Sequence, residues 1–226
     1  GSSLKVKLAA VEWMVYQDVK SEDSLFNRLK RLEEGVFGEV QAGPIKDRMK
    51  NLVQLIWAAD DVKTVNTVVE KETLVKIKLE DRVDSSKNKV NDQVPFVVTQ
   101  DVMIDGKLVI TKGTRGVGTI TEVNAAGRLG RDGKLKIDFG TIEAVDGTPI
   151  RLNSADKSLK ENQSLQLAAG ASMVGVVLLA GNPIGLAGGL LVKGDDITIE
   201  KDVEFFIEVS KPVQVNAISM EVSAAR

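Results

Sequence analysis

The sequence contains no cysteine and no histidine. Without these two residue types the chain has no disulfide bond, no thiolate nucleophile and none of the commonest zinc and haem ligands. The absence of histidine also removes the Ser-His-Asp triad and the usual proton shuttle at neutral pH. We therefore expect a protein that is not an enzyme and that binds no metal or cofactor.

An excess of charge of one sign is also lacking. The chain has 30 basic and 32 acidic residues, and its formal net charge is −2. A basic surface that would attract the phosphates of nucleic acid is therefore not expected. We exclude nucleic acid as a partner.

The sequence leaves the compartment open, because a protein without cysteine fits both the cytoplasm and a bacterial envelope that does not depend on disulfides. Gly1, Ser2 and Ser3 are typical of the remnant that cloning leaves. We expect that a signal peptide was removed upstream of Leu4.

The length of 226 residues allows two domains, each with its own core. The first, residues 4–62, contains an internal repeat with a period of about 20 residues. Three segments, 8–16, 29–37 and 49–57, each place apolar residues at positions 1, 4 and 8 and an aromatic residue at position 9. That spacing predicts three short amphipathic helices.

The aromatic residues of this repeat are the candidate core or contact residues of the module: Trp13, Tyr16, Phe37 and Trp57. Two interpretations stay open, a self-contained helical core and a surface for a partner chain. The neighbouring charges are interpreted as solvent-exposed pairs within helices, three or four residues apart. They are Arg28, Arg31, Arg48, Glu33, Glu34 and Asp47.

From residue 67 to residue 215 the pattern changes to the alternation of a β domain. Leu74, Ile77 and Leu79 alternate with lysines, and a run of β-branched residues follows. Asp-Gly at 105–106, 132–133 and 146–147 predicts three tight hairpin turns. Gly113, Gly116 and Gly118 precede a strand pattern, so we expect a bulge or a barrel corner there and not a phosphate-binding loop.

A glycine-rich insertion, residues 164–193, interrupts the β domain. Residues 162–192 contain no charged side chain, and Asn182-Pro183 divides the apolar run. As helices, 167–181 and 184–192 would be roughly 22 and 14 Å long, too short for a hydrocarbon core of about 30 Å. Small residues recur four apart, a spacing that brings helices close together in apolar surroundings. These candidate packing residues are Ala171, Gly175, Gly181, Gly185 and Gly189.

Three interpretations of the insertion stay open. It forms a helical hairpin buried on its own barrel, a hairpin used for oligomerisation or for membrane association through residues 167–192, or a glycine-rich loop that closes over a ligand. A nucleotide loop is disfavoured, because Lys193 is followed by Gly194 and not by serine or threonine.

The order of features from residue 70 to residue 210 resembles the C-terminal domain of TrbI-type proteins, the scaffold components of conjugation and type IV secretion systems. The resemblance includes a strand ending in "DV", a "DGK" hairpin, a "TKG" turn where that family has "IPKG", and then a strand that begins with glycine. It implies a small β-barrel, ring assembly and an apolar helical antenna at the outer membrane. The helical repeat is not matched, and the insertion is shorter than that antenna.

The sequence therefore predicts an α+β chain, with a three-helix repeat module followed by an antiparallel β-barrel or sandwich that carries an apolar helical hairpin. We expect a structural assembly protein of the bacterial envelope, periplasmic or outer-membrane associated, with a copy of itself or another envelope protein as partner. One alternative is a module that binds cell-wall glycan or a peptide, using Phe96, Phe139, Phe205 and Phe206. A formal alternative is a hydrolase that uses Asp138 and Glu143 as acid and base.

Overall fold

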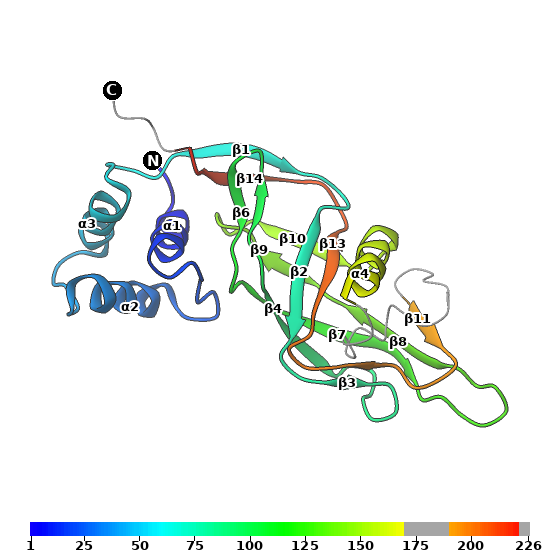
Figure 1. Cartoon of the computed structure of the whole chain (residues 1–226). Helices are drawn as coiled ribbons and strands as arrows, with labels where there is room; N and C mark the ends of the chain where they lie inside the picture. Colours follow the sequence, from blue (N-terminus) through cyan, green and yellow to red (C-terminus); the bar gives the residue numbers. More distant parts are fainter. Residues whose placement is uncertain (170–189, 222–226) are drawn as a thin grey trace.

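The computed structural model describes residues 1–169 and 190–221. Three helices come first, α1 (Leu4–Tyr16), α2 (Leu25–Phe37) and α3 (Ile45–Trp57), and antiparallel strands follow (Figure 1). The α+β class predicted from the sequence is confirmed. A fourth helix, α4 (Asp156–Ala169), lies between strands of the β region.

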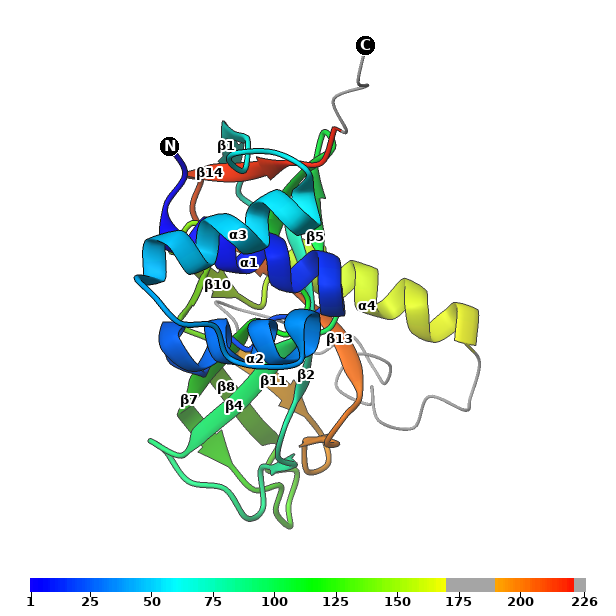
Figure 2. The same cartoon turned by 90° about the vertical axis from the view of Figure 1, so that its left-hand side faces the viewer.

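The three N-terminal helices end at the aromatic residues that close each sequence repeat, and each begins one turn earlier than the repeat. Ser3 and Ser24 cap α1 and α2, and their hydroxyl oxygens accept hydrogen bonds from the first turn. Pro44 is the N-terminal capping residue of α3 and supplies no side-chain hydrogen bond. Figures 1 and 2 show the three helices grouped at one side of the strands, with α1 nearest to them.

The strands form one four-stranded sheet, one curled eight-stranded sheet and a short two-stranded ladder. The first has the order β1 (Thr64–Val69), β14 (Val213–Ser219), β6 (Lys107–Ile110), β5 (Val102–Ile104). The second has the order β11 (Leu190–Lys193), β8 (Gly133–Asp138), β7 (Arg115–Asn124), β4 (Gln93–Val98), β2 (Leu74–Leu79), β13 (Glu204–Val209), β10 (Pro149–Asn153), β9 (Thr141–Glu143). The third pairs β12 (Thr198–Ile199) with β3 (Val83–Asp84).

The curled sheet encloses a half-barrel core. Phe96 is fully buried, and its ring meets that of Phe139 edge to face with centroids 5.6 Å apart. The buried apolar residues of the helices, among them Leu32 and Leu52, belong to the same cluster as those of the strands. The helices therefore pack against the β region and are not separated from it by a solvated linker.

Two of the three predicted Asp-Gly turns connect paired strands. Asp105 and Gly106 both have positive φ angles between β5 and β6, as a two-residue hairpin requires. At Asp146-Gly147, only the glycine has a positive φ, in a longer turn between β9 and β10.

The prediction at Asp132-Gly133 is wrong. The chain reverses earlier, at Leu129 and Gly130, which have positive φ angles. Gly133 already belongs to β8, where an added Cβ would lie 2.4 Å from the Asp195 carbonyl oxygen. Glycine is needed at this position for close approach between two segments and not for a turn.

The insertion is partly helical and partly extended in the described residues. Helix α4 continues to Ala169 and so includes the first three residues of the helix expected over 167–181, whose remaining residues lie outside the described ranges. Residues Leu190–Lys193 form β11 and pair with β8, so the expectation of a helix over 184–192 is wrong at its end. Three consecutive apolar residues are too few to distinguish a helix from a strand, and the edge of β8 selects the strand.

Candidate functional site at the junction of helices and sheet

Buried ion pairs join the three N-terminal helices. Arg28 Nε of α2 donates to Glu12 Oε1 of α1 at 2.7 Å, and Arg48 Nε of α3 donates to Glu33 Oε2 of α2 at 3.1 Å. Both carboxylates are completely buried, and both arginines are less than 9% exposed. The interpretation of Arg28, Arg48 and Glu33 as solvent-exposed pairs within helices is therefore wrong.

Each buried glutamate also accepts a hydrogen bond from a backbone N–H of the loop that follows its helix. Glu12 Oε2 accepts from Lys20 at 3.1 Å, and Glu33 Oε2 accepts from Gln41 at 3.3 Å. One carboxylate thus fixes a helix, the next loop and the next helix, and this arrangement occurs twice. The Glu33 carboxylate raises the pKa of Arg48 above its usual value through the hydrogen bond that it accepts.

The remaining charges of that group have other environments. Arg31 is half-buried, its guanidinium lies 3.8 Å from the centre of the Tyr16 ring, and its Nη1 is 3.9 Å from Glu12 Oε2. Its interpretation as a solvated pair within α2 is also wrong. Glu34 and Asp47 are exposed.

The four predicted aromatic residues lie in different environments. Trp13 is half-buried and donates from Nε1 to Asp101 Oδ2 at 2.8 Å. Tyr16 donates from its hydroxyl to the Arg31 carbonyl oxygen at 3.2 Å. Phe37 is 37% exposed, whereas Trp57 is half-buried and its Nε1 has no hydrogen-bond partner among the described residues. Only Trp13 makes a hydrogen bond to the β region.

The helices are attached to the β region at the turn between β6 and β7. Asp101 accepts from Trp13 through one oxygen and from the Lys112 backbone N–H, at 2.7 Å, through the other. Val19 N–H donates to the Lys112 carbonyl oxygen at 3.0 Å, and Arg115 N–H donates to Ser21 Oγ at 2.8 Å. The loop after α1 therefore pairs with the "TKG" turn through directed hydrogen bonds.

Gly113 makes this attachment possible. Its φ is +90°, and a Cβ at this position would lie 2.5 Å from the Val19 carbonyl oxygen and still closer to the Asp18 carboxylate. A side chain would separate the loop from the turn, so the glycine is needed for both its conformation and its size.

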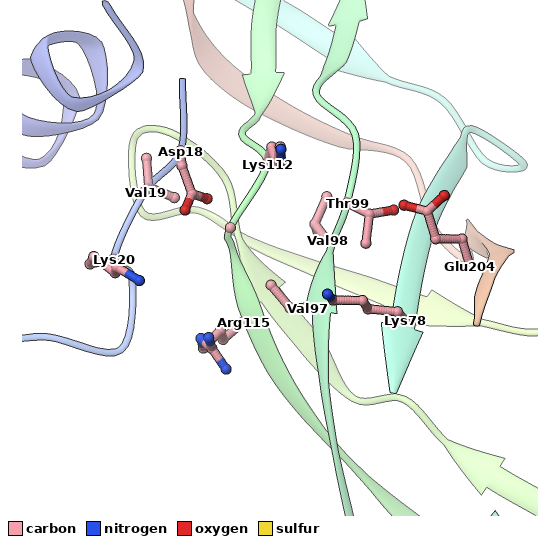
Figure 3. A pocket seen from close by; sticks show the side chains of 11 residues that line it. Asp18, Val19, Lys20, Lys78, Val97, Val98, Thr99, Lys112, Arg115 and Glu204 are labelled. Atoms are coloured by element: carbon pink, nitrogen blue, oxygen red, sulfur yellow. The ribbon is translucent and has the colours of Figure 1, made fainter. Parts of the chain in front are cut away.

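A pocket of about 290 Å³ opens beside this contact (Figure 3). Valines 97 and 98 supply apolar lining, together with Val19. Six charged residues surround them, four basic and two acidic: Lys20, Lys78, Lys112, Arg115, Asp18 and Glu204. Among the residues that line the pocket, the basic ones therefore outnumber the acidic ones by two.

The sheet register explains why these side chains lie together. Glu204, Lys78, Val97 and Arg115 are directly opposite one another across β13, β2, β4 and β7. Residues paired in this way project from the same face, and neighbouring strands are about 4.8 Å apart. Lys78 and Arg115 therefore stand on either side of Val97, which is 8% exposed and forms the floor of the pocket.

Helix α4 is fixed at the other side of β13. Asn162 Nδ2 donates to the Phe206 carbonyl oxygen at 2.9 Å, and the Phe206 N–H donates to Asn162 Oδ1 at 2.6 Å. The buried Glu208 carboxylate accepts from both the N–H and the hydroxyl of Ser158, each at 3.0 Å. The Asn162 contact lies on the part of β13 that β10 does not pair with, and both contacts fix the direction in which α4 leaves the sheet (Figures 1 and 2).

The residues assigned to the two alternative functions, glycan or peptide binding and hydrolysis, do not line this pocket. Phe96, Phe139 and Phe205 are buried and present no face to a sugar, and Phe206 lies under Lys76 at 5.6 Å. Asp138 accepts from the Gly140 N–H and from Arg151 at 2.9 Å, and these interactions lower its pKa. A lowered pKa opposes a role as general acid.

Glu143, the other candidate of that pair, is exposed and forms an ion pair with Lys5 at 3.2 Å. The candidate packing residues Ala171, Gly175, Gly181, Gly185 and Gly189 lie outside the described residues. In the part of the chain that is described, no helix has the length and apolar character required to cross a bilayer.

The chain is similar to ComB10 of the Com type IV secretion system of Helicobacter pylori, with 14% sequence identity and a TM-score of 0.35, over 65% of this chain and 90% of that chain. No family model matches the sequence. No curated protein matches it either.

Proposed function

We propose that this chain is a non-enzymatic assembly protein of the bacterial cell envelope, which presents its uncharged insertion from a rigid β scaffold to copies of itself or to a membrane. The observation that carries the proposal is the attachment of α4 to β13. Asn162, whose amide holds α4 on Phe206, is the first residue of the stretch without charge. The insertion therefore starts from a fixed point and in a fixed direction.

The order of elements along the β region also supports the proposal. The hairpin at 105–106, the turn at 111–113, a strand that continues with Gly116, and the turn at 146–147 precede α4, and closing strands follow. This is the order for which residues 70–210 resemble the TrbI-type scaffold domain. In that family the insertion is the antenna, and here we assign the same role to residues 164–193.

The finer proposal concerns the small residues of the insertion. Ala171 with Gly175, and Gly181 with Gly185 and Gly189, are four residues apart, a spacing that places small residues on one face of a helix. Such faces associate closely in apolar surroundings, because backbones approach without side-chain obstruction. We assign them to contacts between copies of the insertion, in or at the membrane.

The test replaces Gly185 with Leu in the full chain. We expect a smaller oligomer in analytical ultracentrifugation or weaker flotation with liposomes, because the leucine keeps the insertion apolar but prevents close approach. Gly194→Leu is the matched control, since no atom of the described residues lies within 4 Å of a Cβ built there. Unchanged size and unchanged flotation of Gly185→Leu would overturn the assembly role.

A further inference from the structure

The pocket between the α1–α2 loop and the sheet has a chemistry that the assembly role does not use. Two of its basic groups are already held by carboxylates: Arg115 contacts Glu22 at 3.2 Å and also Glu80, and Lys78 lies 3.7 Å from Asp202. These contacts orient the two cations at the edges of the Val97 floor. Both residues also line the pocket.

The other two basic groups have no such partner. The side chains of Lys20 and Lys112 make no hydrogen bond or ion pair with any residue in the described ranges. Their backbones are nevertheless fixed, because Lys20 N–H is bound by the buried Glu12 and Lys112 is held by Asp101 and Val19. Two amines that form no ion pair with any described residue thus stand on fixed backbone in the lining of one pocket, which also contains the carboxylates of Asp18 and Glu204.

The size of the pocket restricts what it can take. A volume of about 290 Å³ is at the lower end for a site that encloses a whole small molecule. It suits one compact oxyanion, to which ammonium and guanidinium groups donate charge-assisted hydrogen bonds. Figure 3 shows Lys20 on the α1–α2 loop and Arg115 close to that loop on β7. Lys78 lies beyond them on β2, the strand next to that of Val97.

We propose that this pocket binds an oxyanion, a carboxylate or phosphate group, between Lys20, Lys112, Lys78 and Arg115. The group has two possible sources, a free anion or the acidic side chains of a peptide segment in a partner. Because the pocket is built by both the helical loop and the sheet, the bound anion would connect the two. This inference does not depend on the insertion and goes beyond the assembly role.

The experiment titrates the full chain with inorganic phosphate and, separately, with a hexaglutamate peptide, at constant ionic strength. Binding is followed by the amide NMR signals of Lys112, Gly113 and Arg115. The test variant is Lys20→Gln with Lys112→Gln, which removes the two amines without a partner. The control is Lys46→Gln with Lys50→Gln, which removes the same charge from the exposed side of α3.

We expect a rise in Kd of at least about tenfold for the Lys20/Lys112 variant and of less than about twofold for the control, since two charge-assisted contacts are lost only in the former. Binding of phosphate identifies a free anion as the source, and binding of the peptide alone identifies an acidic segment. The proposal is overturned if neither probe shifts the three amide signals. It is also overturned if both double variants weaken binding equally.

Discussion

Glu33 of α2 and Arg48 of α3 form an ion pair in the interior of the helical module, where the carboxylate has no exposed surface and the arginine is 7% exposed. A buried charge of this kind is tolerated only while its partner is present. Glu12 and Arg28 repeat the arrangement one helix earlier. The stability of the module therefore depends on intact pairs.

Replacing Glu33 with Ala is expected to lower the free energy of unfolding by about 3–5 kcal/mol, because Arg48 keeps its charge in a buried site. Urea unfolding followed by circular dichroism measures the change. Glu34→Ala, at the next position and exposed, serves as the control and should stay within about 0.5 kcal/mol of the parent. Equal effects of the two substitutions would show that the pair is not the cause.

Gly113→Ala tests the attachment of the helices to the sheet. Gly106 also has a positive φ, but within residues 1–169 and 190–221 no atom lies within 4 Å of a Cβ built on it. Gly106→Ala should therefore cost only the conformational strain, about 1–2 kcal/mol. Gly113→Ala should cost more, because its Cβ also meets the Val19 carbonyl oxygen, and it should increase hydrogen exchange in the loop after α1. If both variants lose the same stability, close approach at Gly113 has no energetic role.

Asn162→Ala tests the attachment of α4. The substitution leaves the N–H and C=O of Phe206 without their partner, and we expect a loss of about 1–3 kcal/mol. Limited proteolysis should then cut α4 faster than in the parent. Lys157→Ala, on an exposed position of the same helix, should leave the cleavage rate unchanged. A protected α4 in Asn162→Ala would show that Ser158 and Glu208 are sufficient.

Asp84 predicts a pH dependence of stability. The Ser86 hydroxyl donates to its carboxylate at 2.6 Å, and this interaction lowers the pKa of Asp84 in the folded state. A group whose folded pKa is lowered stabilises the protein above its unfolded pKa of about 3.9, and this stabilisation is lost as the pH falls through the folded pKa. Asp84→Asn should therefore be less stable than the parent at pH 7.

The difference between the parent and Asp84→Asn should become smaller at pH 3, because the carboxylate of the parent is then partly protonated. Urea unfolding of both proteins at the two pH values measures it. Other carboxylates titrate in both proteins, so their contribution cancels in the comparison. A difference that stays constant or grows at pH 3 contradicts the assignment.

The helices were predictable from the sequence because their apolar positions recur in register and end at aromatic residues. The ion pairs between them were not predicted, since spacing within one helix says nothing about a partner on the next. A signal was nevertheless available: Glu12 and Glu33 occupy the same position of the repeat, four residues after an inward leucine. Arg28 and Arg48 also share a position, which a solvated charge would not require.

The charged pocket could not be predicted, because its residues come from five separate segments that only the strand register and the α1–α2 loop bring together. The "TKG" turn was recognised as a turn, but its contact with Val19 depends on tertiary packing. A helix was predictable from residue 167 onward because of the apolar run, but its first turns from Asp156 lie in a charged segment and were not predicted. The end of the insertion forms β11 because it pairs with the edge of β8. A local sequence pattern cannot predict this pairing.

The Asn162 side chain forms hydrogen bonds with the main-chain N–H and C=O of Phe206, as a neighbouring strand does elsewhere in the sheet. An internal deletion that removed α4 together with the insertion would leave this margin of β13 bare, with main-chain groups ready to pair with any extended polypeptide. Such a deletion is therefore expected to yield a protein that precipitates, and deletions meant to remove only the insertion should keep α4 through residue 163.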